Sequence, residues 1–92
     1  MPKRTDANQA EIVRALRDAG CTVVDLHKVG RGCPDILVGI HSRNVLLEIK
    51  TATGRLTVDE INFHGTWEGQ YAIVRNVEEA FAVINGLEEM PY

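Results

Sequence analysis

The sequence predicts an α/β domain with a mixed four-stranded sheet flanked by helices, in the order helix, three strands, helix, strand, helix. Apolar residues repeat at helical spacing in three segments, and four short runs rich in β-branched residues lie between turn-forming residues. The predicted helix between the third and fourth strands permits a right-handed crossover, so these two strands can pair in parallel. The first three strands are close enough along the chain for antiparallel pairing.

The composition is typical of one small globular domain. The chain has 92 residues, of which 45% are hydrophobic and 25% charged, which suits a single modest core. No apolar run has the length of a membrane span, and residues 1–4 lack the features of a signal peptide. We therefore expect a cytoplasmic protein without a membrane partner. Residues 1–5 and 87–92 are expected to fray.

The net charge leaves the class of partner open. It is formally −3, but four of the 13 acids follow Arg75, so the preceding part carries 9 acids and 10 bases. A bound cation can also neutralise acidic side chains, so formal charge does not define the surface that a partner meets. Charge therefore neither supports nor excludes a nucleic-acid partner.

The first helix is predicted from about Asp6 to Ala19. Thr5 or Asp6 can cap it, and Gly20 is a natural C-terminal stop. The apolar positions that should face the core are Ile12, Val13, Leu16 and Ala19.

Three strands should follow, at residues 22–26, 36–40 and 45–50. The first two are separated by residues 27–34, a segment with two glycines, a proline and two bases that is typical of a loop. The polar residues 41–44 indicate a hairpin turn into the third strand.

The remaining elements are a helix, a strand and a last helix. Thr57 and Glu60 have capping-box spacing at the start of a helix that runs to about Trp67. Ile61, Trp67 and either Phe63 or His64 are expected to point inward. A strand at 71–74 precedes a helix that begins near residue 76 and is closed by Gly86. Its repeating apolar positions are Val77, Ala80, Phe81 and Ile84.

Three charged residues stand in the middle strands, where apolar residues are expected. Asp35 opens the second strand, and Glu48 and Lys50 interrupt the third. Strand side chains alternate between faces, so Glu48 and Lys50 share one face. Unpaired charge is costly to bury, and a divalent cation with a phosphate would satisfy these groups. Mg²⁺ and Mn²⁺ prefer carboxylate and other oxygen ligands, so Asp35 and Glu48 are the candidate metal ligands.

Neighbouring groups can complete such a site. The backbone carbonyl of Ile49 is a possible third oxygen ligand. Lys50 can stabilise developing negative charge or hold an attacking water. Glu11 lies at the edge of the apolar stripe of the first helix, from which it could reach the metal or position Lys50.

Each of these residues also has a purely structural interpretation. Asp35 follows a proline and could belong to a turn. Glu48 and Lys50 could form an ion pair on an exposed sheet face. Glu11 could be a solvated residue of an amphipathic helix. The combination of all of them, in this element order, favours a site for metal-dependent hydrolysis of a phosphodiester, that is, a nuclease.

Basic residues near the candidate site are possible phosphate contacts. Lys28 and Arg31 flank glycines that let a backbone approach DNA closely, although a solvated loop is the simpler interpretation. Arg55, in the loop after the third strand, is a further candidate for phosphate contact.

The site pattern resembles the core of the PD-(D/E)xK nuclease superfamily. Pro34 and Asp35, then Glu48, Ile49 and Lys50 on the next strand, match its motif. Within that superfamily the chain is most similar to the VRR-Nuc group in its small standalone form. The matching segments are KVGRGCPD at 28–35, EIKT at 48–51 and LT at 56–57, and the resemblance covers roughly residues 11–80.

The resemblance implies a restriction-endonuclease-like core and Mg²⁺- or Mn²⁺-dependent cleavage of DNA. Standalone members are associated with homodimers that resolve four-way (Holliday) junctions, and a two-fold dimer would supply the two symmetric cuts. One position departs from the pattern, because Glu60 stands where the family often has glutamine. Glu60 could serve only as the capping partner of Thr57, or it could add an acid to the site.

We therefore expect a homodimeric, metal-dependent endonuclease for branched DNA in the cytoplasm of a bacterial cell or a virus-infected bacterial cell. Asp35, Glu48 and the Ile49 carbonyl would hold the metal, with Lys50 and Glu11 assisting and Lys28, Arg31 and Arg55 binding DNA. Two alternatives remain open, a monomeric nuclease for flaps or single strands and a non-catalytic DNA-binding module of the same fold.

Overall fold

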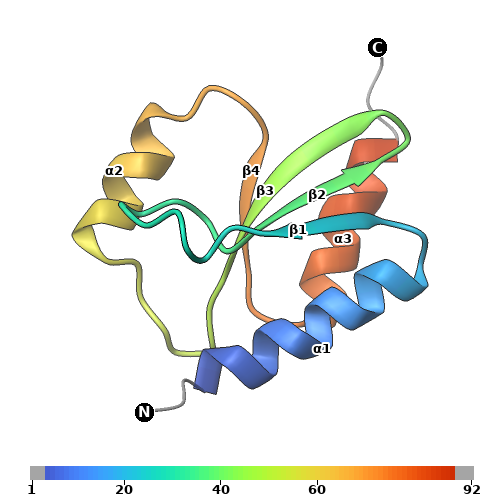
Figure 1. Cartoon of the computed structure of the whole chain (residues 1–92), viewed down its shortest axis with the longest axis horizontal. Helices are drawn as coiled ribbons and strands as arrows, with labels where there is room; N and C mark the ends of the chain where they lie inside the picture. Colours follow the sequence, from blue (N-terminus) through green and yellow to red (C-terminus); the bar gives the residue numbers. More distant parts are fainter. Residues whose placement is uncertain (1–3, 89–92) are drawn as a thin grey trace.

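The computed structural model describes residues 4–88, with side chains for residues 8–87, so the expected fraying of residues 1–3 and 89–92 lies outside the described part. The helices and strands follow the predicted order (Figure 1). They are α1 (Arg4–Asp18), β1 (Thr22–Asp25), β2 (Ile36–Ile40), β3 (Arg43–Ile49), α2 (Val58–Thr66), β4 (Tyr71–Val74) and α3 (Val77–Glu88).

The sheet confirms the predicted mixed topology. Its strand order is β1-β2-β3-β4, with antiparallel pairing from β1 to β3 and parallel pairing between β3 and β4. In the register, Ile36 pairs with Leu47, and Leu46 pairs with both Leu37 on β2 and Tyr71 on β4. This register decides which side chains of neighbouring strands share a face.

One face of the sheet carries the hydrophobic core. Helices α1 and α3 lie beside each other against this face, which we call the core face (Figure 1). Ile12 and Leu16 of α1 are fully buried, as the apolar stripe predicts, whereas Ala19 lies after the helix and is exposed. The other core residues are Cys21, Val23, Ile36, Val38, Val45, Leu47, Ile49, Val74, Ala80, Ile84 and Leu87.

The prediction of inward-facing residues on and after α2 is wrong for Ile61 and Trp67. Helix α2 has no buried residue, and Ile61 and Trp67 are 54% and 45% exposed. Figure 1 shows α2 on the far side of the molecule from α1 and α3, so it adds nothing to their core. Its apolar spacing is real, but no opposing layer covers that stripe.

The end of α3 is a second correction. Gly86 was expected to close this helix, but α3 continues to Glu88 and Leu87 is only 4% exposed. The gain from burying the leucine side chain outweighs the low helix propensity of one glycine, which costs about 1 kcal/mol.

Among the described helices, none is both long and apolar enough to cross a membrane.

Candidate active site at the opposite face of the sheet

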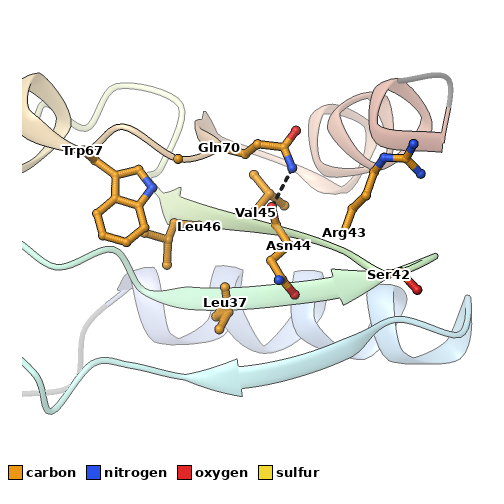
Figure 2. Close-up of a pocket in the computed structure, with 9 residues that line it drawn as sticks. Leu37, Ser42, Arg43, Asn44, Val45, Leu46, Trp67 and Gln70 are labelled. Atoms are coloured by element: carbon orange, nitrogen blue, oxygen red, sulfur yellow. Dashed lines mark hydrogen bonds between the residues drawn. The ribbon is translucent and has the colours of Figure 1, made fainter. Parts of the chain in front are cut away.

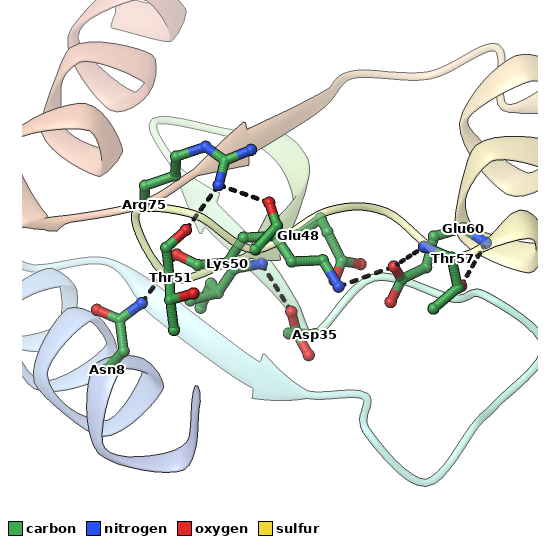
Figure 3. A network of polar contacts seen from close by, with 10 residues as sticks. Asn8, Asp35, Glu48, Lys50, Thr51, Thr57, Glu60 and Arg75 are labelled. Atoms are coloured by element: carbon green, nitrogen blue, oxygen red, sulfur yellow. Dashed lines mark hydrogen bonds and ion pairs between the residues drawn. The ribbon is translucent and has the colours of Figure 1, made fainter. Parts of the chain in front are cut away.

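The structure brings Asp35, Glu48 and Lys50 together on the face of the sheet that α1 and α3 leave uncovered, which we call the site face (Figure 3). Asp35 stands one residue before β2. Because Ile36 pairs with Leu47, Asp35 lies opposite Glu48. Leu47 and Ile49 point into the core, so strand alternation directs Glu48 and Lys50 to the site face.

Asp35 is fixed by the backbone of β3. The amide of Ile49 donates a hydrogen bond of 2.6 Å to Oδ2 of Asp35. The N–H and C=O of one strand residue point to the same neighbouring strand, so the Ile49 carbonyl lies on the Asp35 side. Burial raises the pKa of Asp35 although this hydrogen bond and Lys50 act in the opposite direction.

Glu48 is a buried acid with an unsatisfied oxygen. The residue is 2% exposed, and its Oε1 has no hydrogen-bond partner within the described residues. Burial, and then the negative charges of Asp35 and Glu60, raise its pKa from 4.5 to about 8. Two adjacent carboxyls without enough positive charge are therefore costly at neutral pH.

Lys50 supplies part of that positive charge. Its Nζ lies 3.5 Å from Oε2 of Glu48 and 2.8 Å from Oε1 of Glu60. Burial lowers the pKa of Lys50, but the two carboxylates outweigh this effect and raise it. An ammonium has three donors, so two carboxylate contacts leave capacity for one more oxygen ligand.

Glu60 forms the predicted capping box and also contacts the candidate site. The capping box is formed, because the Thr57 amide donates to Glu60 Oε1 over 2.8 Å and the Glu60 amide donates to Thr57 Oγ1 over 3.2 Å. The same Oε1 contacts Lys50. Burial acts to raise the Glu60 pKa, but the Lys50 contact and the Thr57 hydrogen bond outweigh it and lower the pKa.

Two residues near the acids were missed from the sequence. The hydroxyl of Tyr71 is buried without a hydrogen-bond partner in the described part of the chain. Burial and the charge of Glu48 raise its pKa to about 12. Burial and the same charge raise the pKa of Cys33. Only the register of β4 against β3 brings Tyr71 to the site face, and no local motif signals it.

The three bases expected to bind DNA are exposed near the same end of the sheet. Lys28 and Arg31 belong to the loop between β1 and β2, and Arg55 to the loop before α2. Arg31 and the glycines on either side of it have positive φ angles. A Cβ at Gly32 would lie 2.2 Å from the Asp59 carbonyl oxygen, so only glycine lets this loop rest on the start of α2.

Glu11 is not brought to the cluster by any contact that the structure shows. It is exposed on α1. The helix reaches the site strand through Asn8 instead, whose Nδ2 donates to the Lys50 carbonyl over 3.0 Å (Figure 3).

Arg75, the residue after β4, has a structural role. Its Nη1 donates to the carbonyls of Thr51 and Gly54 over 2.6 and 2.8 Å. These bonds hold the loop that follows Lys50, so the guanidinium fixes backbone rather than facing solvent.

The donor set fits a cation that keeps most of its water. Among the described residues, no three histidine, cysteine, aspartate or glutamate side chains are grouped to hold a metal ion alone. Mg²⁺ and Mn²⁺ are commonly held by one or two carboxylates with retained water. Asp35, the partnerless Oε1 of Glu48 and the Ile49 carbonyl meet that requirement.

Comparisons of the chain with protein-family models, with curated proteins and with solved structures find no match.

Proposed function

We propose that this protein is a metal-dependent endodeoxyribonuclease with a restriction-endonuclease-like core, most similar to VRR-Nuc enzymes. The observation that carries the proposal is Glu48, which is 2% exposed, lies opposite Asp35 and is 3.5 Å from Lys50, and whose Oε1 has no hydrogen-bond partner in the part of the chain that the structure describes. A folded protein retains such a costly arrangement where function needs it. A merely structural ion pair would leave neither a partnerless oxygen nor a second acid opposite it.

The residues divide the chemistry of phosphodiester hydrolysis between them. Asp35, Glu48 and the Ile49 carbonyl would hold Mg²⁺ or Mn²⁺, which supplies positive charge to neutralise the scissile phosphate. The ammonium of Lys50 orients the attacking water or stabilises charge that develops on the phosphate oxygens. Glu60 positions that ammonium through their 2.8 Å contact. Lys28, Arg31 and Arg55 contact neighbouring phosphates.

The proposed substrate is branched DNA, in particular the four-way junction, cut by a homodimer. One small domain with one site makes one cut, whereas resolution of a junction takes two symmetric cuts. This part of the proposal rests on the resemblance and on that symmetry argument.

The decisive experiment is a cleavage assay with matched four-way, flap, duplex and single-stranded substrates, in Mg²⁺, Mn²⁺ or EDTA. We expect metal-dependent paired cuts in the four-way junction and a dimer by gel filtration. Lys50→Ala should cleave at least about a hundredfold more slowly, and Arg14→Ala, which removes an exposed base from α1, should cleave like the wild type. A monomer that makes unpaired cuts would favour the flap or single-strand nuclease. Binding without cleavage in either metal would favour the non-catalytic module.

A second readout is independent of cleavage. Mg²⁺ or Mn²⁺ should raise the melting temperature of the wild-type protein, because a ligand that binds the folded state stabilises it. The same ions should have no such effect on Glu48→Gln. An equal shift in both proteins would place the cation elsewhere.

A further inference from the structure

A hollow of about 420 Å³ lies on the site face beyond the acids, and we call it the Trp67 hollow (Figure 2). It extends between the segment that follows α2 and the β2–β3 hairpin. Its size is within the range of small-ligand sites, about 300–1,000 Å³. The residues that characterise it are Leu37, Leu46, Trp67, Arg43, Asn44 and Gln70.

The walls of the hollow combine an apolar floor, an aromatic side and a polar rim. Leu37 and Leu46 are paired across β2 and β3 and form the floor. Figure 2 shows the Trp67 indole beside Leu46 at one end and Arg43 at the other. At the rim, the Gln70 side-chain amide donates to the Asn44 carbonyl over 2.7 Å.

The position of the Trp67 indole is fixed by its neighbours although the side chain is partly exposed. Trp67 stacks on Phe63 with ring centroids 5.4 Å apart and planes 16° apart. A Cβ at Gly69 would lie 2.8 Å from the indole Nε1, so the chain after α2 passes close beside it. Trp67 remains 45% exposed, which leaves much of the indole available to a ligand.

The floor of the hollow and the candidate active site occupy neighbouring positions of β3. Leu46 precedes Glu48 by two residues on the same face, a separation of about 7 Å. A DNA strand whose phosphate lies at Glu48 therefore carries a neighbouring nucleotide over Leu46. In a paired duplex the faces of that base are stacked on its neighbours. An unpaired base offers a flat π-face for the indole and polar edges for the rim.

We propose that the Trp67 hollow binds an unpaired nucleobase of the strand that is cut, with the base stacked on the Trp67 indole and its edge toward Arg43, Asn44 and Gln70. This inference rests on the proposed function and deepens it, because it names the feature of branched DNA that the enzyme recognises. A flap offers such bases in its single strand, and the base pairs at the branch point of a four-way junction open more easily than those inside uninterrupted duplex.

The first test uses the fluorescence of Trp67, the single tryptophan of the chain. Metal-free protein is titrated with a single strand of about 12 nucleotides, with the same strand as a duplex, and with an abasic strand of equal length. Stacking should quench the emission with the single strand alone. Equal quenching by the abasic strand, or none by any strand, would overturn the proposal. An emission change with protein concentration alone, together with a larger mass in gel filtration, would assign the hollow to a second copy and also overturn it.

The second test compares Trp67→Ala with Ile61→Ala, which removes another exposed apolar side chain from the α2 region outside the hollow. Trp67→Ala should weaken single-strand binding about tenfold or more, Trp67→Phe less, and Ile61→Ala not measurably. Gly69→Ala should resemble Trp67→Ala, because the added methyl group displaces the indole.

Two readouts separate stacking from structure and from catalysis. The Trp67→Ala penalty should disappear with the abasic strand, whereas loss of folding would weaken binding of both strands alike. Base-dependent quenching without cleavage in any metal would leave the hollow supported and the nuclease proposal rejected. Cleavage without base-dependent quenching would leave the nuclease proposal supported and the base-binding proposal rejected.

Discussion

The two faces of the sheet differ in how their side chains are used. The core face is covered by α1 and α3, and Leu47 and Ile49 on it are 0% and 2% exposed among apolar neighbours. One residue away on the same strand, the site face presents Glu48, whose Oε1 has no hydrogen-bond partner within the described residues. Helix α2, which contacts this face through Glu60, has no buried residue. The comparison indicates that stability is concentrated on one face, whereas the other holds a pair of carboxyls that are costly to ionise, as functional sites often do.

Truncation of adjacent leucines should give the largest contrast between the faces. Leu47→Ala removes a side chain from the centre of the core and should lower the free energy of unfolding by about 2–5 kcal/mol. Leu46→Ala, on the site face, should lower it by about 1–2 kcal/mol, because Leu46, although only 6% exposed, lies outside the core cluster and lines the hollow. Urea unfolding of both variants measures the difference. Equal losses would mean that the two faces contribute alike to stability.

Removal of the Lys50 ammonium from the site face should have the opposite effect to Leu47→Ala, with a large loss of cleavage and little loss of stability. Lys50→Ala should slow junction cleavage about a hundredfold to a thousandfold, the range found when one transition-state donor is removed, and leave junction binding nearly unchanged. Parallel cleavage and binding gels on the same protein decide this prediction. Retained cleavage would contradict the role of Lys50, and lost binding would make it a DNA contact instead.

Neutralisation of Glu48 should stabilise the metal-free protein while abolishing cleavage. The folded-state pKa of Glu48, about 8, lies above its unfolded value near 4.5, so the folded chain holds the proton more tightly between these pH values. Stability of the metal-free wild type should therefore fall as pH rises through that window. Since one pKa unit corresponds to about 1.4 kcal/mol, Glu48→Gln should gain about 1–3 kcal/mol near pH 8.5 and little near pH 4.5.

Thermal unfolding across this pH range measures the effect. Glu68→Gln, which alters an exposed glutamate between α2 and β4, is the matched control and should follow the wild type. A Glu48→Gln protein that is less stable than wild type at high pH would mean that the charge is compensated in the folded state.

The buried residues of the core face could be predicted from the sequence better than the surroundings of the site face. Ile12, Leu16 and the strand alternation around Leu47 identified the core because apolar spacing reports burial when an opposing layer exists. The same spacing misled at Ile61 and Trp67, because nothing in the sequence tells whether another layer will cover a stripe.

For the candidate site, the local sequence pattern identified the proposed metal ligands but not the residues that surround them. Asp35, Glu48 and Lys50 were found because hairpin strands and alternation fix their relative positions. Tyr71 and the Lys50 contact of Glu60 depend on where β4 and α2 come to rest against β3, which is set by tertiary packing. The burial of Glu48 also follows from that packing, and it is the property that makes the site costly.

The smallest expected effect concerns Glu60, which joins α2 to the site face. Glutamine can form the same capping box, and its carbonyl can still accept from Lys50, so Glu60→Gln should change the equilibrium constant of unfolding and the rate of cleavage by less than about threefold each. Glu60→Ala removes both bonds and should cost about 1 kcal/mol of stability and slow cleavage several-fold through a misplaced Lys50. Unfolding and single-turnover cleavage of both variants test this order. If Glu60→Gln slows cleavage as much as Glu60→Ala, the negative charge itself is needed, and Glu60 acts as a third acid rather than as a positioning residue.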